Sequence, residues 1–280
     1  MLFLHCTRTL SCYYLPSPGA RRVRFFVVWC SDPSECKIGK MLRAIKNAIF
    51  SVFGPDWFLT ISALWNIHRS YEPLFQEWLK TIPQGGTLLD IGANIGITCA
   101  IAKRRRPDIN MIAFEPVPHN VKVLHRVKSI YSIKNMQIQS IAIGDKEGQV
   151  SMTIPMMDGL IKTGLSHVVS EEFSNPTVKN LPSFKTVDVR MRALDSFSFE
   201  RVDAIKIDVE GHEYQVLNGA RQLLLLFRPL VFCEMWSSSN RAQTIELMES
   251  LGYSVTSKGA EDFLFTPQSI AEPSRVSLSE

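Results

Sequence analysis

The chain has 280 residues, enough for one α/β domain with a substantial core. Its formal net charge of +4 comes from one end: residues 1–40 hold six Lys or Arg and two Asp or Glu, whereas residues 41–280 hold 25 of each kind. A neutral body lacks the basic face of nucleic-acid-binding domains, and no apolar run is long enough to span a bilayer. We therefore expect no nucleic-acid partner and no transmembrane segment.

Residues 1–40 form an atypical N-terminal extension. No acidic residue precedes Asp32, and Arg21, Arg22 and Arg24 come before an apolar patch. Three interpretations stay open: an Arg-rich targeting segment, a natural extension, or an over-extended gene start with Met41 as the natural initiator, which we favour. The cysteine spacing requires neither a zinc site nor an oxidising compartment, so we expect a cytoplasmic protein.

Residues 41–82 are expected to form a helical cover over the domain. Apolar residues recur with helical spacing on one face of the predicted helix Met41–Phe53, which Gly54 and Pro55 end. Such a helix either packs on its own domain, which we favour, or lies on a membrane surface. A second helical region is expected over Trp57–Leu79. A cover of this kind often helps to form a substrate pocket.

The most informative segment follows. An apolar strand, Thr87–Leu89, runs into Asp90, then a turn with Gly92 and Gly96, then a helix that begins near Ile97. A dinucleotide fold needs G-x-G-x-x-G, whereas this turn is G-x-x-x-G with an acid at its mouth. A carboxylate there would repel a pyrophosphate but suits a ligand with an ammonium group. The segment therefore favours S-adenosylmethionine over a nicotinamide cofactor.

The next predicted strand, Asn110–Phe114, ends at Glu115-Pro116, about twenty residues after the turn, where a carboxylate can hold ribose hydroxyls. A helix is expected from Pro118 to Tyr131 and a third strand over Met136–Ile143. Alternation of strands and helices predicts a parallel sheet. The pattern then changes, so we expect an insertion over about 149–200, with strands near 149–154 and 186–191. The catalytic domain should cover 83–267, and residues 268–280 should form a flexible tail.

A last group of polar residues follows the predicted strand Val202–Ile207. Asp208, Glu210 and His212 lie in the turn before the next helix, and ligands of such sheets bind at the carboxyl ends of strands. A hydroxyl acceptor gains from a general base, so these three are the candidate catalytic residues: Asp208 is expected near the methyl group, Glu210 as base or substrate ligand, and His212 as the third choice. Together with Glu234, after the strand Leu230–Cys233, the acids could gather Mg²⁺, but the spacing does not require it and we predict no metal.

These segments resemble the FkbM-type, S-adenosylmethionine-dependent methyltransferases. The matching pieces are LLDIGANIG, IAFEPVPHN, IQSIAIGDKEGQVSM, VDAIKIDVEGHEYQVLNGARQLL and PLVFCEMW, in the order that the family keeps. The resemblance implies a Rossmann-like class I methyltransferase fold. In that fold a mostly parallel seven-stranded sheet has helices on both faces and ends in an antiparallel hairpin. The residues that it implies for the cofactor are Asp90, Gly92, Asn94, Gly96, Glu115, Ile141, Ala142 and Asp145.

The resemblance further implies O-methylation of a small molecule or saccharide. Where the family often has Gly-x-Ser-Ser in the insertion, this chain has Gly164-Leu165-Ser166-His167, which leaves the acceptor open and makes His167 a second candidate base. The alternatives are a methyltransferase acting on RNA or protein, and a non-catalytic module that binds S-adenosylmethionine. Neither the acceptor nor the oligomeric state follows from the sequence.

Overall fold

A computed structural model describes residues 57, 59–67, 72–157, 160–161, 166–168, 183–236 and 239–268. All of them belong to one compact unit, Pro55–Glu280. The predicted extension 1–40, the predicted helix Met41–Phe53 and all but the first residue of the predicted tail lie outside the described residues. In the described part of the chain, no helix has the length and apolar character needed to cross a membrane.

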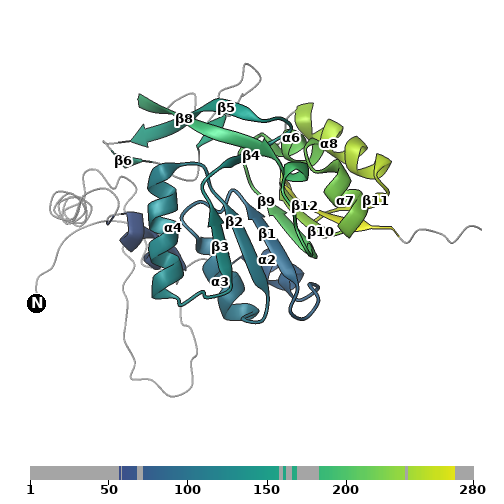
Figure 1. The fold of residues 1–280 in the computed structure, drawn as a ribbon, viewed down its shortest axis with the longest axis horizontal. Helices are drawn as coiled ribbons and strands as arrows, with labels where there is room; N and C mark the ends of the chain where they lie inside the picture. Colours follow the sequence, from purple (N-terminus) through teal and green to yellow (C-terminus); the bar gives the residue numbers. More distant parts are fainter. Residues whose placement is uncertain are drawn as a thin grey trace, which may run out of the picture. The chain divides into compact units, whose positions relative to one another are not determined.

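The unit is built on a seven-stranded sheet in the order β11-β12-β10-β9-β1-β2-β3 (Figure 1). Neighbours run parallel from β10 to β3, whereas β12 is antiparallel to both β10 and β11. The predicted mostly parallel sheet with a terminal antiparallel hairpin is confirmed. Its strands are β1 (Thr87–Ile91), β2 (Asn110–Phe114), β3 (Met136–Gln139), β9 (Ala204–Ile207), β10 (Leu230–Glu234), β11 (Tyr253–Ser257) and β12 (Asp262–Pro267).

Helices cover both faces of this sheet, as the class I fold requires. On one face Phe75 and Trp78 of α2 pack against Phe232, with ring centroids 5.9 and 5.5 Å apart. On the other face Val216 and Leu224 pack against the apolar residues of β1, β9 and β10. The helices are α2 (Pro73–Leu79), α3 (Ile97–Arg105), α4 (Pro118–Ile130), α6 (Glu213–Asn218), α7 (Arg221–Phe227) and α8 (Ser239–Ser250), and residues 59–67 are also helical.

The order of the strands places a crevice beside β1. The chain passes from β1 to β2 and β3 on one side, and after the insertion it returns to β9 on the other side of β1. Loops that leave β1 and β9 in opposite directions open a gap at the carboxyl ends of these strands, where ligands of α/β sheets bind. The predicted polar turns after β1, β2 and β9 all lie at this edge.

The predicted third strand, Met136–Ile143, is wrong in its second half. β3 ends at Gln139, whose carbonyl oxygen accepts a hydrogen bond from the N–H of Ile141 at 3.0 Å, so the chain bends there. Residues Ala142–Gly144 form β4, which pairs with β8 in a second sheet. The bend falls at two consecutive polar residues, Gln139 and Ser140, which interrupt the alternation of apolar and polar residues in β3.

The second sheet has the order β4-β8-β5-β6, with β7 paired to β5; β4 precedes the predicted insertion, and most of the remaining strands lie within it. β5 and β8 form a long antiparallel ribbon that passes over the carboxyl edge of the main sheet (Figure 1). The predicted strands at 149–154 and 186–191 lie within these two strands. The bounds are β5 (Gly148–Met157), β6 (Leu160–Ile161), β7 (His167–Val168) and β8 (Ser183–Ala193), followed by a short 3-10 helix (Leu194–Ser196).

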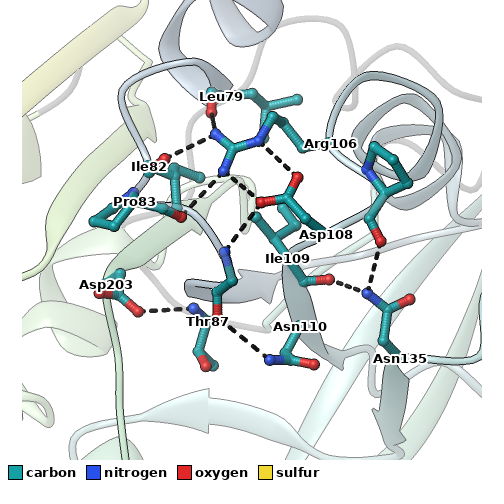
Figure 2. Close-up of polar contacts among 12 residues, drawn as sticks. Leu79, Ile82, Pro83, Thr87, Arg106, Asp108, Ile109, Asn110, Asn135 and Asp203 are labelled. Carbon is teal, nitrogen blue, oxygen red and sulfur yellow. Dashed lines mark hydrogen bonds and ion pairs between the residues drawn. The ribbon is translucent and has the colours of Figure 1, made fainter.

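Arg106 lies at the opposite edge of the main sheet, where the amino ends of β1 and β2 meet the loop after α2 (Figure 2). Its guanidinium donates hydrogen bonds to the carbonyl oxygens of Leu79 and Ile82, each at 2.8 Å, and of Pro83 at 3.0 Å. Asp108 binds the same guanidinium in a bidentate pair at 2.8 and 2.9 Å. The guanidinium of Arg106 thus satisfies carbonyl groups at and after the end of α2, and it connects that helix to the loop before β2.

Candidate functional site

The loop between β1 and α3 turns at two glycines. Gly92 has a φ of +81° and Gly96, the residue before α3, a φ of +86°, a region that favours glycine. A Cβ on Gly92 would lie 1.9 Å from the carbonyl oxygen of Asp208, and one on Gly96 would lie 2.7 Å from Cδ1 of Leu124. Both glycines are therefore needed for contacts within the chain, and the turn presents Asn94 to the cavity described below.

Asp90, the next-to-last residue of β1, is buried with 1% of its surface exposed. Its Oδ2 accepts hydrogen bonds from the Thr98 hydroxyl at 2.7 Å and from the Cys99 thiol at 3.2 Å. Its Oδ1 lies 3.7 Å from Nζ of Lys206. The carboxylate thus points into the sheet, toward α3 and β9, and Asp90 does not line the cavity.

Lys206 is a charged residue in the middle of a buried strand. The register pairs it with Asp90 across β1 and β9, so their side chains share one face of the sheet. Its Nζ also lies 3.1 Å from Oδ2 of Asp208. Burial disfavours the ammonium, but the charges of Asp208 and Asp90 outweigh it and raise the pKa of Lys206 above its ordinary value.

Sequence reasoning missed Lys206 as a functional residue. The available signal was a lysine inside an apolar strand with an aspartate two residues later, because that spacing puts both side chains on one face. Its partner in β1 follows only from the register, which the structure supplies.

Glu115 follows β2 and is held by three donors. The N–H groups of Asn94 and Val117 donate to its two carboxylate oxygens at 2.8 and 2.9 Å, and Nδ2 of Asn120 donates at 3.1 Å. Burial raises the pKa of Glu115 to about 7, although these hydrogen bonds act in the opposite direction. The carboxylate therefore has a fixed orientation. Oε1 accepts from both Val117 and Asn120, whereas Oε2 accepts from Asn94 and has a lone pair left for a ligand.

The turn between β9 and α6 carries the three predicted catalytic residues. Glu210 has a φ of +56°, and burial, followed by the charges of Asp208 and Glu234, raises its pKa to about 9. His212 precedes the first residue of α6, and burial lowers its pKa. At neutral pH Glu210 therefore holds a proton and His212 is a neutral imidazole.

Two further acids lie close behind this turn. Glu213 is buried and accepts a hydrogen bond from the N–H of Gly211 at 2.8 Å, and burial raises its pKa to about 7. The charge of Asp208, and then burial, raise the pKa of Glu234 to about 7. Nevertheless, among the described residues no group of three or more His, Cys, Asp or Glu side chains is arranged to hold a metal ion. The positive charge beside Asp208 is supplied by Lys206.

A cavity connects these elements. It lies between the carboxyl edge of the main sheet and the second sheet, and both sheets contribute to its wall. Five polar atoms in its lining are buried without a hydrogen-bond partner among the described residues, although buried polar groups are normally satisfied. They belong to Asn94, Asn120, Ser166, Glu210 and His212, and the imidazole atom is Nε2. These unpaired atoms mark a place for a polar ligand.

Eight of the eleven predicted site residues line this cavity: Gly92, Asn94, Glu115, Ile141, Ala142, Asp208, Glu210 and His212. Asp90, Gly96 and Asp145 do not. Asp145 is exposed in the turn between β4 and β5, and Gly96 packs against α4. Lining residues that sequence reasoning did not select are Ile91, Phe114, Pro116, Asn120, Ile143, Met152, Ser166, Val168 and Val209.

The insertion supplies one wall of the cavity. Met152 of β5 pairs with Val168 of β7, and both line the cavity together with Ser166. His167 pairs with Thr153 and does not line it, because alternate residues of a strand point to opposite faces. The structure therefore brings Ser166, but not His167, to the site.

Comparison with known proteins completes the description. The sequence profile of the Methyltransferase FkbM domain matches residues 90–255, more than half of the chain. Methyltransferase 1 from Beauveria bassiana is 26% identical over 184 residues, which cover 62% of this chain and 74% of that protein. Methyltransferase sdnD from Sordaria araneosa is 25% identical over 216 residues, which cover 68% and 83%.

Among solved structures, methyltransferase FkbM from Methylobacillus flagellatus KT aligns with 76% of this chain and 60% of its own at 14% identity, with a TM-score of 0.46. The span matched by the family profile contains the turn after β1, Glu115 and the turn between β9 and α6.

Proposed function

Because the chain belongs to the FkbM methyltransferase family, we propose that it transfers a methyl group from S-adenosylmethionine to a hydroxyl group of a small molecule or saccharide. The observation that carries this proposal is the set of unpaired polar atoms in one cavity, between Glu115 on one side and the turn from Asp208 to His212 on the other. A donor with a diol at one end and a positive charge at the other satisfies both sides.

The lining residues fit S-adenosylmethionine in three respects. Glu115 has the position and, on Oε2, a free lone pair to accept from a ribose hydroxyl. Ile141 and Ile143 provide an apolar surface for a flat base. The Asp208 carboxylate brings negative charge to the part of the cavity where a sulfonium and an ammonium would lie, and the protonated Glu210 beside it can donate a hydrogen bond. In this proposal Asp90 does not contact the donor, and its carboxylate holds Lys206 in place beside Asp208.

When bound, S-adenosylmethionine supplies a methyl group on a positively charged sulfur, which leaves as a neutral thioether. The chain must align the acceptor with that methyl group and receive the proton that the hydroxyl loses as its oxygen bonds to carbon. We assign proton acceptance to Nε2 of His212, because it is neutral at pH 7, unpaired and in the cavity lining. Glu210, protonated at the same pH, can donate a hydrogen bond instead.

The lining also supports an acceptor without phosphate groups. It contains no Lys or Arg among the described residues, whereas Asp208, Glu115 and Glu210 are all acidic. A polyphosphate backbone would find no cation in this lining and would be repelled by the Asp208 carboxylate, while hydroxyl groups can donate to the acidic side chains. A small polyhydroxylated molecule therefore suits the cavity better than RNA.

Two measurements test the proposal. Calorimetry should show binding of S-adenosylmethionine and none of NAD. Transfer of a labelled methyl group should be detected with small-molecule and saccharide fractions and not with RNA or protein fractions. Failure to bind S-adenosylmethionine would contradict the proposal that it is the methyl donor. Binding without transfer to any fraction would favour a non-catalytic module, and labelled RNA would contradict the acceptor class.

Variants then separate binding from chemistry. His212→Gln should lower kcat by about 10²- to 10⁴-fold while the dissociation constant of S-adenosylmethionine stays within about threefold. His125→Gln is the matched control, because His125 is exposed on α4 and does not line the cavity. An unchanged kcat in His212→Gln would remove His212 from the role of base.

A further inference from the structure

Asn120 lies in the first turn of α4 with only 1% of its surface exposed. Its Nδ2 donates to Oε1 of Glu115 at 3.1 Å. Its Oδ1 has no hydrogen-bond partner in the part of the chain that the structure describes, and the residue lines the cavity. A buried amide oxygen without a donor is unfavourable, so a donor from a ligand would satisfy it.

The orientation of this amide follows from its neighbour. Oε1 of Glu115 accepts from the N–H of Val117, and Oε2 accepts from the N–H of Asn94. Because an ionised carboxylate only accepts hydrogen bonds, Asn120 must offer its nitrogen to Glu115 and turn its oxygen away. The two polar atoms of an amide share one carbon, so Oδ1 lies close beside the carboxylate of Glu115. A pair of hydroxyls on adjacent carbons can span two such acceptors.

We propose that Asn120 is a second ribose-binding residue: its Oδ1 accepts a hydrogen bond from one hydroxyl of the adenosine ribose while Glu115 accepts from the other. The inference rests on the proposed function, since it takes S-adenosylmethionine as the ligand. Asn120 thereby contacts the ligand itself, and its Nδ2 also keeps the carboxylate of Glu115 in place. Each of the two ribose hydroxyls is thus bound by a different residue.

The test compares ligands that differ by one hydroxyl. Calorimetry would use S-adenosylhomocysteine and its 2′-deoxy and 3′-deoxy analogues with the full-length chain and with Asn120→Ala. The wild type should bind each deoxy analogue at least about tenfold more weakly than the parent, the effect of one lost hydrogen bond to a buried partner. For each hydroxyl, the preference is the dissociation constant of the deoxy analogue divided by that of S-adenosylhomocysteine. In Asn120→Ala this ratio should fall to about one for one hydroxyl and stay at its wild-type value for the other.

Asn135→Ala is the matched control. Asn135 also has an unpartnered Oδ1 and donates from Nδ2 to the carbonyl oxygens of Pro107 and Ile109 (Figure 2), but it does not line the cavity. Its substitution should leave both hydroxyl preferences unchanged. If Asn120→Ala does not fold, as judged by thermal unfolding, Asn120→Ser takes its place, because it keeps a small polar group but cannot reach as far.

The outcomes are separable. A wild type that does not bind S-adenosylhomocysteine overturns the proposed function, and the inference falls with it. A wild type that binds, with both preferences retained in the Asn120 variants, overturns the inference alone. An equal fall of both preferences would mean that Asn120 only positions Glu115, and it also overturns direct contact.

Discussion

Replacement of Lys206 by methionine tests the buried charge network most directly. The side chains of Lys206 and Asp90 are 5% and 2% exposed, and Nζ lies 3.7 Å from Asp90 and 3.1 Å from Asp208. Methionine keeps the length of the side chain but leaves the Asp90 carboxylate with only Thr98 and Cys99 as donors. Loss of one partner of a buried pair costs about 3–5 kcal/mol. We expect that loss in the free energy of unfolding, a large part of the roughly 5–15 kcal/mol typical of a domain.

Urea denaturation, followed by intrinsic tryptophan fluorescence, would measure the loss. The double variant Asp90→Asn, Lys206→Met should recover at least about 2 kcal/mol, because it removes the uncompensated charge. Lys258→Met is the control, since Lys258 is exposed and its substitution should change stability by no more than about 0.5 kcal/mol. A Lys206→Met protein as stable as the wild type, or a double variant with strictly additive losses, would refute the reasoning.

Three more predictions concern the turn after β1, the base and the opposite edge of the sheet. Gly92→Ala should lose at least about 2 kcal/mol in a urea melt, because its Cβ would lie 1.9 Å from the Asp208 carbonyl oxygen at a φ of +81°; an unchanged midpoint would contradict the contact. If His212 is the base, kcat at saturating donor should be constant from about pH 7 to 8.5, since its pKa is lowered and the imidazole is already neutral. A kcat that rises with pH toward about 9 would identify Glu210, whose carboxyl must first lose its proton. Arg106→Met should lower the free energy of unfolding by about 2–3 kcal/mol and leave the KM for the donor unchanged, because its hydrogen bonds hold α2 at the far edge of the sheet; a raised KM would show that this edge reaches the site.

Much of the fold could be predicted from the sequence because local signals agreed with tertiary structure. Apart from Asp90 and Lys206, the buried residues of β1, β2, β9 and β10 are apolar, so each strand can be recognised as an apolar segment followed by a polar turn. In parallel strands these turns fall at one edge of the sheet. Glu115 and the turn from Asp208 to His212 were therefore placed at one site from sequence alone.

The remaining residues depend on information that a linear pattern does not carry. The bend after Gln139 is marked only by the polar pair Gln139 and Ser140, and the pairing of β3 and β4 with different sheets does not follow from that signal. Asn120 becomes a lining residue only through the direction in which α4 leaves Glu115. The face that Ser166 presents is set by the pairing of β7 with β5, a contact between segments of the insertion.

The pairing of Asp90 with Lys206 has a consequence for how the chain reaches its fold. Asp90 belongs to β1, before the insertion, and Lys206 belongs to β9, after it. A slip of β9 by one residue would turn Lys206 to the other face, among the apolar side chains around Ile205 and Val231, and would leave Asp90 without its cation. The salt bridge thus disfavours any assembly in which the two halves of the sheet join out of register.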